Sequence, residues 1–428
     1  MKKNISWLML AITLAVAALR AQPPQTQPIP ENILVVRSDS LQGLVGARAL
    51  FPLRGGLKGE AWAIADVLAT GSRSPTGEHA PRIQIAQTDP TLKKNSPTLV
   101  LSWQEGERFG TACLTQTTGL LTSPSTRFTP GLIAATDIAA TVEGKAFSAG
   151  RSAVLVPGNL TQLEAYQAVW ERKAELLRFL VLAPWLFSLA LLFAAWRGKS
   201  FGNPKIFGGI ALVLWADLLL GSPLLERLPF SYSVTEAARF YGIGNDAAGL
   251  FIGCALAAGF EVPALLAVAL TIGAPSLGAN NGCFLAALVG IMAQEVGKLP
   301  VRKRLRAALA ALLGIALLFL GLARWDASRG AGVQTHLGQA VSGERVGVVR
   351  LIGRKLAMNG HLLVSSPWSL LLLTSGVLLA RQRAGRALIA GGAALALNDS
   401  GVLAAAMLLL PLAAQKTQSP PAQSGAGG

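Results

Sequence analysis

Long apolar stretches dominate the second half of the chain, whereas the first part mixes short apolar and polar runs. Between residues 177 and 412, apolar stretches recur at lengths suited to helices that span a bilayer. Residues 22–175 instead read like ordinary water-exposed sequence. The pattern therefore predicts a water-exposed domain at 22–175, an all-α polytopic membrane domain at 176–413, and a disordered tail rich in proline, serine and glycine at 414–428.

About eight helices are expected in the membrane domain. They fall on apolar segments at 177–196, 206–221, 247–260, 262–275, 281–296, 306–323, 366–380 and 387–412. The third and fourth segments are short, rich in glycine and separated only by Phe260 and Glu261. They form either two spans or a re-entrant pair of half-helices.

The N-terminus has the pattern of an export signal at residues 1–21. Lys2 and Lys3 precede an apolar run at 5–19, and small residues follow before Gln22. Both a cleaved signal peptide and an uncleaved signal anchor fit this pattern. In either case the segment that follows is predicted to be exported.

The distribution of charge gives an orientation. The 428 residues include 38 Lys and Arg against 22 Asp and Glu, a net charge of +16, yet only 14% of them are charged, against roughly 25% in soluble proteins. Basic residues gather in three short loops between predicted helices, at 197–205, 298–306 and 381–386. Such loops stay on the cytoplasmic side, which again makes residues 22–175 extracytoplasmic. Loop charge beside anionic lipid accounts for the basic balance, so no nucleic-acid partner is predicted.

The exported part alternates short β-rich runs with a helix-like run. The β-rich runs lie at 33–36, 98–101 and 119–122, and the helix-like run lies at 60–69. This alternation predicts an α/β domain with a mainly parallel sheet. Cys113 is the only cysteine of the exported sequence, so no disulfide within the domain is expected.

Two segments of this domain resemble alkaline-phosphatase-like domains. They are Ala-Asp-Val-Leu-Ala-Thr-Gly-Ser-Arg at 65–73 and residues 121–141, which include Thr-Ser-Pro-Ser-Thr-Arg and Thr-Asp-Ile-Ala-Ala-Thr. The resemblance implies a Ser or Thr nucleophile and a two-metal site for phosphoryl transfer. Thr70 and Ser72 are then remnants of a nucleophile, or hydroxyls that cap a turn beside Gly71.

The ligands of such a metal centre are not all present. His79 is the only histidine of the exported part, and Asp39 is a displaced candidate for the ligand at the end of the first strand. The domain is also far shorter than a complete phosphatase of this kind. We therefore predict a degenerate, catalytically inactive relative with no metal site.

Two acidic side chains interrupt the predicted spans. A charge within a span costs on the order of 2.5–3.5 kcal/mol on insertion scales, so each one is a candidate functional residue. Asp217 lies near the outer end of its helix, where it could also snorkel or pair with a helix N-terminus. Asp399 lies between Asn398 and Ser400 near the middle of the last span. These three residues form either a functional site or a polar clamp between helices.

The predicted outer loops hold further candidates. Arg239, Asn245 and Asp246 place a forked donor, an amide and a carboxylate within eight residues. A basic amphipathic helix is expected at the outer interface within 324–367, where it could bind phosphate or lipid headgroups or simply anchor on anionic lipid. Its candidate ligand-binding residues are Arg350, Arg354 and Lys355.

Together, the membrane motifs resemble a family of uncharacterised bacterial polytopic membrane proteins in which an alkaline-phosphatase-like domain precedes such a membrane domain. Asp246 stands where a Glu would be expected in that family. The resemblance implies a multi-pass protein of the bacterial cytoplasmic membrane. The resemblance does not indicate which activity the protein has, and the cofactor is unknown.

Three functions are compatible with these residues. The first is an envelope enzyme or lipid-handling protein that acts on a phosphorylated lipid or lipid-linked glycan at the extracytoplasmic face, with Asp246 or Asp399 as base or cation ligand. The second is a proton- or cation-coupled transporter that uses Asp217 and Asp399. The third is a non-catalytic envelope scaffold. The first requires the outer residues to converge with Asp399. Its substrate contacts are expected from Arg239, Asn245, Arg350, Arg354, Lys355, Asn398 and Ser400.

Overall fold

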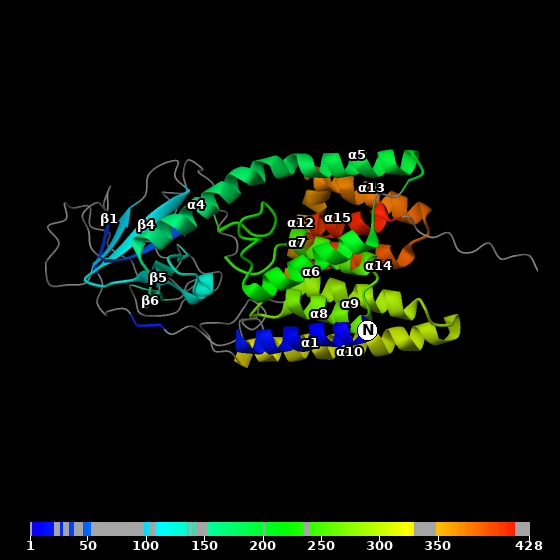
Figure 1. The fold of residues 1–428 in the computed structure, drawn as a ribbon, viewed down its shortest axis with the longest axis horizontal. Helices are drawn as coiled ribbons and strands as arrows, with labels where there is room; N and C mark the ends of the chain where they lie inside the picture. The colour runs from blue at the N-terminus through cyan, green and yellow to red at the C-terminus, as the bar shows by residue number, and fades with distance from the viewer. Residues whose placement is uncertain are drawn as a thin grey trace, which may run out of the picture.

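The computed structural model consists of a β-sheet domain at one end and a bundle of helices at the other (Figure 1). Several predicted features lie outside the described residues, namely the helix at 60–69, Asp39, Thr70, Ser72, His79 and Arg239. The structure describes residues 2–20, 26–28, 34–37, 46–52, 98–102, 108–134, 137–138, 141, 152–199, 202–234, 240–328 and 348–415.

The sheet has six strands in the order β1-β3-β4-β2-β5-β6. The predicted β-rich runs correspond to three of them, whereas the strands that form the central antiparallel pair, β2 and β4, are additional. Small residues interrupt both of these strands, and this weakens the β-propensity signal in their sequences. The strands are β1 (Leu34–Arg37), β2 (Gly46–Pro52), β3 (Thr98–Ser102), β4 (Phe109–Thr115), β5 (Leu120–Thr122) and β6 (Val154–Val156).

The sheet is mixed, so the prediction of a mainly parallel sheet is wrong. Only β1 with β3 and β2 with β5 pair in parallel, and the other three neighbouring pairs are antiparallel. One reason is the short connection between β3 and β4, because residues 103–108 are too few to cross over to a parallel neighbour. Cys113 is buried within β4, where burial raises the pKa of its thiol although Arg48 opposes the shift, so the thiol stays protonated.

A helix connects the sheet to the bundle. α4 (Leu160–Leu177) begins after Asn159, whose side chain accepts a hydrogen bond from the backbone N–H of Gln162, while the side chain of Gln162 accepts one from the backbone N–H of Asn159. The apolar side of α4 packs on the sheet through Trp170, whose ring lies 5.8 Å from that of Phe109. The helical chain continues through η3 (Arg178–Leu182) into α5 (Ala183–Trp196). The predicted helix at 177–196 is therefore the second half of a longer helical segment (Figure 1).

Every apolar segment expected to be helical contains a helix, but the last one, at 387–412, is two helices. The chain breaks at residues 398–400, between α14 and α15. The other α-helices in the described part of the chain are α1 (Lys2–Leu19), α6 (Pro204–Leu220), α7 (Asn245–Ala257), α8 (Val262–Gly273), α9 (Asn281–Val296), α10 (Val301–Ser328), α12 (Val348–Ser365), α13 (Trp368–Arg381), α14 (Gly385–Leu397) and α15 (Gly401–Ala414).

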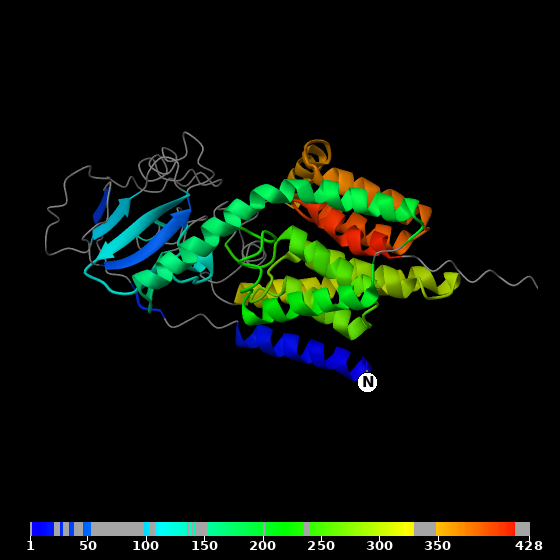
Figure 2. The ribbon, with the colours of Figure 1, turned by 45° about the horizontal axis from the view of Figure 1, so that its top comes forward.

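Among the residues that the structure describes, two helical segments are long and apolar enough to cross a membrane, Leu160–Trp196 and Val301–Ser328. A third span results if Lys355–Ser365 and Trp368–Arg381, which meet at 90°, are counted together. Because of this bend, α12 lies across the direction of the long helices, and Figure 2 looks nearly along its axis. The basic amphipathic helix expected from the sequence is therefore present as a helix at one edge of the bundle.

α7 and α8 form a hairpin of two short helices. They contain 13 and 12 residues, which corresponds to about 20 Å and 18 Å, less than the roughly 30 Å of a bilayer core. α7 packs closely on α15, because Gly249 and Gly253 lie directly against the backbone of Ala404 and Leu408. This small-xxx-small spacing permits a close approach of the two helices.

The three basic loops lie at the same end of the bundle, opposite the sheet domain (Figures 1 and 2). The N–H of Gly202 donates to the carbonyl of Ala414, and the side chain of Arg386 lies close to Gly297. At the other end, near the sheet domain, the N–H of Ile243 donates to the carbonyl of Gly278. The bundle thus has a basic end and an end that faces the sheet.

α1 packs along α8 and α6 as a helix of the bundle. Its Thr13 hydroxyl lies 3.4 Å from the Thr271 hydroxyl and accepts a hydrogen bond of 2.9 Å from the indole N–H of Trp215. Near its end, the carbonyl of Ala17 accepts from the hydroxyl of Ser276 at 2.7 Å. These contacts join α1 to α6, to α8 and to the loop that follows α8.

Candidate functional site

The break between α14 and α15 places polar groups where the ends of several helices meet. Asn398 has extended backbone angles (φ −108°, ψ 151°), so it ends α14. Ser400 (φ −108°, ψ 55°) precedes α15, and the carbonyl of Leu395 lies where a side chain on Gly401 would be. Only glycine fits at the start of α15, because the chain folds back closely on the last turn of α14.

Asn398 joins the end of α14 to the start of α9. Its side chain is buried and donates to the carbonyl of Ala394 at 2.8 Å. Its Oδ1 accepts from the Sγ of Cys283 at 3.4 Å. Gly282 lies so close to Asn398 that a larger residue there would overlap its side chain.

Asn280 joins the start of α9 to the start of α7. Its Oδ1 accepts from the backbone N–H of Cys283 at 3.1 Å, which caps α9. Its Nδ2 donates to Asn245 Oδ1 at 2.9 Å and to the carbonyl of Ile243 at 3.0 Å. The N-termini of α7 and α9 are therefore held side by side.

α12 contributes two side chains, one turn apart, to the same place. Lys355 Nζ donates to the carbonyl of Leu397 at 2.7 Å and lies 3.9 Å from Asp399 Oδ1. The side chains of Lys355 and Asp399 are 23% and 48% exposed, so both reach the edge of the cluster, although the Asp399 Oδ1 that faces Lys355 is itself buried. Asn359 is buried; its Oδ1 accepts from the N–H of Gly401 at 2.7 Å.

We call this cluster the polar junction. The N-termini of three helices, α7, α9 and α15, meet in it. Each carries a partial positive charge from the helix dipole, although Asp246, Asn280 and Asn359 already accept one N–H group from α7, α9 and α15, respectively. Lys355 adds a full positive charge, while Asp399 supplies a half-exposed carboxylate. Such an arrangement is suited to an anion with a hydroxyl group beside it. The polar junction consists of Asn245, Asn280, Cys283, Lys355, Asn359, Asn398 and Asp399.

One acceptor beside the polar junction has no hydrogen-bond partner among the residues that the structure describes. It is the buried Oδ1 of Asn281, the first residue of α9. A buried acceptor without a donor costs about 1–3 kcal/mol, so a donor from water or a ligand is expected there.

The predicted site residues are thus only partly brought together. Asn245, Lys355, Asn398 and Asp399 belong to the polar junction, and Ser400 lies at its edge as the residue before α15. Arg350 and Arg354 are part of α12, but their side chains are outside what the structure describes, and Arg239 is outside the described residues altogether.

Asp246, predicted as a base or cation ligand, is instead bonded to backbone N–H groups. Both of its carboxylate oxygens accept from the N–H of Ser231, at 3.0 and 2.9 Å, and one also accepts from the N–H of Ala247 at 2.7 Å. The carboxylate is buried, and its bonds join a loop to the first turn of α7. These contacts give Asp246 a positioning role rather than a place beside Asp399.

Asp217 is also occupied by backbone groups. Its oxygens accept from the N–H of Leu224 at 2.7 Å and of Leu225 at 3.2 Å. Lys173, buried at the end of α4, donates to the carbonyl of Leu225 at 2.7 Å. Asp217 therefore fixes the turn that follows α6. That turn binds α4 through the hydrogen bond from Lys173 to Leu225.

A second polar cluster lies in the sheet domain, between β5 and residue 137. Asp137 is buried and accepts from the hydroxyls of Ser123 and Ser125 at 2.5 and 2.6 Å and from the N–H of Ala134 at 2.8 Å. The cluster closes a loop around the short helix η2 (Pro124–Thr126). Within the described part of the chain, no three His, Cys, Asp or Glu side chains are grouped as metal ligands.

Three residues of the polar junction, Asn280, Cys283 and Asn359, are not among the predicted site residues. Asn280 could have been predicted as a helix cap, because an Asn immediately before an apolar run is typical of a helix N-cap. Cys283 and Asn359 have no such signal, because their role depends on contacts with distant helices.

Comparison of the chain with protein-family models, with curated proteins and with solved structures gives no match.

Proposed function

We propose that this chain is a multi-pass protein of a bacterial cytoplasmic membrane that binds the phosphorylated headgroup of a lipid or lipid-linked glycan at its extracytoplasmic face. The binding site is the polar junction. The observation that carries the proposal is the partly exposed Lys355–Asp399 pair, 3.9 Å apart, at the meeting point of three helix N-termini.

Membrane insertion is supported by the apolar helices and by the position of the basic loops. Two helical segments have the length and apolarity of spans. The three basic loops lie at the end opposite the sheet domain, as the tendency of basic loops to stay in the cytoplasm requires. In this orientation the polar junction lies on the extracytoplasmic side, next to the exported sheet domain.

The chemistry of the polar junction suits a phosphate beside a sugar or glycerol hydroxyl. Lys355 offers a compact positive charge, and the helix N-termini offer N–H dipoles with the same sign. Asp399 can accept a hydrogen bond from a hydroxyl or remove its proton. α12, whose apolar Leu356 and Val364 are exposed, lies across the helices in the position of an interfacial helix, so a lipid headgroup would reach Lys355 from the membrane surface.

In this proposal the sheet domain is a shortened, inactive relative of alkaline-phosphatase-like domains that covers the outer end of the bundle. Its Arg127 lies 4.1 Å above the ring of Tyr241 and donates to the carbonyl of Leu277 at 3.4 Å. The hydroxyls of Ser123 and Ser125 are engaged by Asp137 within the domain. These contacts favour a positioning role for the domain.

A cation-coupled transporter is the second candidate. The break at residues 398–400 inside an apolar segment favours it, because broken helices commonly form ion sites in transporters. Asp217, the second acidic residue that this function would use, is bonded to the N–H groups of a turn. We therefore place transport second.

Two lipids that differ only in a phosphate test the proposal. Phosphatidic acid and diacylglycerol with the same acyl chains would be titrated against the purified full-length protein, and binding followed by native mass spectrometry. We expect phosphatidic acid to bind more tightly, and Lys355→Gln to weaken its binding about 10- to 100-fold, since a hydrogen bond to a charged group contributes roughly 1.5–3 kcal/mol.

Lys199→Gln, an exposed position at the basic end of the bundle outside both proposed lipid sites, is the matched control for loss of one positive charge. It should leave this difference between the two lipids unchanged. Equal binding of phosphatidic acid and diacylglycerol, or full binding by the Lys355→Gln variant, would contradict a phosphate site at the polar junction. Uptake of a proton or cation that depends on Asp399 would instead support the transporter.

A further inference from the structure

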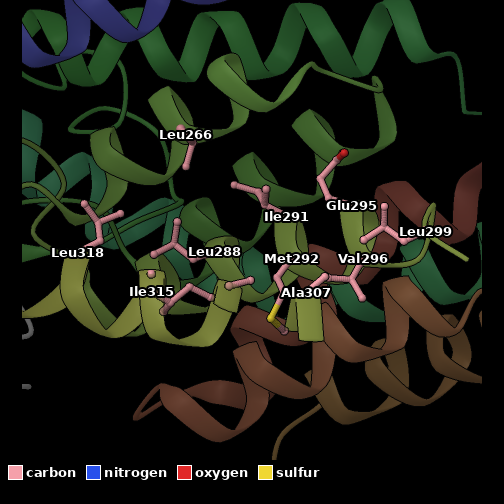
Figure 3. Close-up of a pocket in the computed structure, with 12 residues that line it drawn as sticks. Leu266, Leu288, Ile291, Met292, Glu295, Val296, Leu299, Ala307, Ile315 and Leu318 are labelled. Carbon is pink, nitrogen blue, oxygen red and sulfur yellow. The ribbon is translucent and has the colours of Figure 1, made fainter. Parts of the chain in front are cut away.

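α10 is fully buried only near its C-terminal end. Its buried residues, Leu322, Ala323 and Asp326, all lie near its C-terminus. Toward its N-terminus, a cavity of about 430 Å³ separates it from α9, and Figure 3 shows side chains of both helices around this space. The lining is almost entirely apolar and includes Leu288, Ile291 and Met292 of α9 and Ala307, Ala311 and Ile315 of α10.

The small residues of α10 leave this groove open. Gly314 lines it, and a side chain added at Gly314 would have no atom within 4 Å. From Ala307 to Leu318, the lining residues of α10 extend over about 16 Å of helix. This is roughly half of the 30 Å thickness of a bilayer core, the depth of one leaflet.

Positive charges surround the basic end of the groove. Glu295 and Leu299 line this end, and Lys298 Nζ lies 2.5 Å from Glu295 Oε1. Arg304 folds back so that its Nε donates to the carbonyl of Leu299 at 2.9 Å. Lys303 is exposed four residues before Ala307, on the face of α10 that lines the groove. Three basic side chains and only one carboxylate, that of Glu295, are therefore found in this group of residues.

We propose that this groove binds an anionic phospholipid of the cytoplasmic leaflet, with one acyl chain between α9 and α10 and its phosphate at Lys298, Lys303 and Arg304. The inference takes only membrane insertion and orientation from the proposed function, since the polar junction lies at the opposite end of the bundle. Charge selects this occupant, because an apolar helix from a second copy of the chain would fill the groove but leave the cations without an anion.

Photolabelling of the full-length protein tests the position of the acyl chain. Phosphatidylglycerol with a diazirine in one acyl chain would be added to the purified protein in detergent, and the labelled peptides identified by mass spectrometry. We expect labels on α9 and on the first half of α10. Phosphatidylcholine with the same chain should label these peptides several-fold less, since each nearby Lys or Arg favours an anionic lipid.

Two glycines of α10 provide matched variants. Gly314→Phe fills the groove, whereas Gly321→Phe adds the same ring to the same helix outside the lining, and both positions have open space around them. We expect Gly314→Phe to lose most of the labelling at α9 and Gly321→Phe to keep it. Labelling at α9 that is undiminished in Gly314→Phe would overturn the acyl-chain site.

The headgroup contacts are tested separately. Lys298→Gln combined with Lys303→Gln should remove the preference for phosphatidylglycerol over phosphatidylcholine, while Lys355→Gln at the polar junction should retain it. Equal labelling of the unmodified protein by both lipids would overturn the anionic selectivity. A dimer in native mass spectra, with no label in the groove, would show that a second copy of the chain occupies it.

Discussion

At the scale of single residues, Asn359 is the side chain on which the break between α14 and α15 depends most. Its Nδ2 donates to the carbonyls of Leu395 and Asn398, at 2.9 and 2.8 Å, while its Oδ1 accepts from the N–H of Gly401. These are backbone groups that the end of one helix and the start of the next leave without helical partners. One amide therefore satisfies three of them, and no apolar residue can do the same.

Asn359→Leu should accordingly destabilise the protein strongly. The substitution keeps the approximate size of the side chain but leaves buried backbone groups unpaired, at about 1–3 kcal/mol for each group. We expect the Tm of the purified protein in detergent to fall by several degrees. His361→Leu, at an exposed position of the same helix, is the control and should change the Tm little. A Tm equal to that of the unmodified protein in Asn359→Leu would contradict this role.

Whether residues could be recognised from sequence depended on where their partners lie. Asp399 and Asn398 are conspicuous because they are polar within an apolar run, and Lys355 because it belongs to a basic amphipathic pattern. Asp246 and Asp217 were equally conspicuous, yet their carboxylates bind backbone N–H groups of nearby loops. Sequence pattern shows that a buried charge needs a partner, but it does not show whether that partner is a ligand or a turn.

At the scale of elements, the apolar runs predict where helices lie but not how each helix ends. The segment 387–412 is apolar enough for one continuous helix, and its polar residues could have faced a cavity. The chain turns there because Gly401 fits against Leu395 and because Asn359 binds the freed backbone groups, and both contacts are tertiary. The sheet is also only partly predictable from sequence, since β2 and β4 are strands because they pair with each other more than because of their own β-propensity.

The packing of α7 on α15 gives a second element-scale prediction. A methyl group at Gly253 would overlap the carbonyl of Leu408, which belongs to the backbone and cannot move aside. Gly253→Ala should therefore separate the two helices and lower the Tm, although alanine is the better helix former by about 1 kcal/mol.

Gly392→Ala is the matched control, since a methyl group at that position in α14 meets nothing within 4 Å. It should keep or slightly raise the Tm. If both variants behave alike in a thermal unfolding assay, the close approach of α7 and α15 does not limit the stability of the bundle.

At the scale of the whole molecule, the sheet domain and the bundle are joined by buried polar contacts as well as by the chain. Lys173 is 3% exposed and donates to the carbonyl of Leu225 in the turn that Asp217 holds. Trp170 of the same helix packs against the sheet. α4 thus fixes the sheet domain and the bundle to one another through a single stiff element.

Lys173→Met should loosen this connection. Methionine can occupy much of the same space, but the carbonyl of Leu225 loses a hydrogen bond to a charged group, which contributes roughly 1.5–3 kcal/mol. We expect faster amide hydrogen exchange in residues 221–228, measured by mass spectrometry on the full-length protein. Lys199→Met, at the basic end of the bundle, should not change it, and unaltered exchange in Lys173→Met would show that the turn is held by Asp217 alone.

The packing of α1 against Trp215, Thr271 and Ser276 has a topological consequence. In the proposed orientation, and with α1 retained, the sheet domain is a loop whose two ends both return to the same bundle, one through α1 and the other through α4 and α5. A single nick by a protease within that loop would then leave both fragments attached to the membrane. Release of the sheet domain would then require two cuts, one on each side of it.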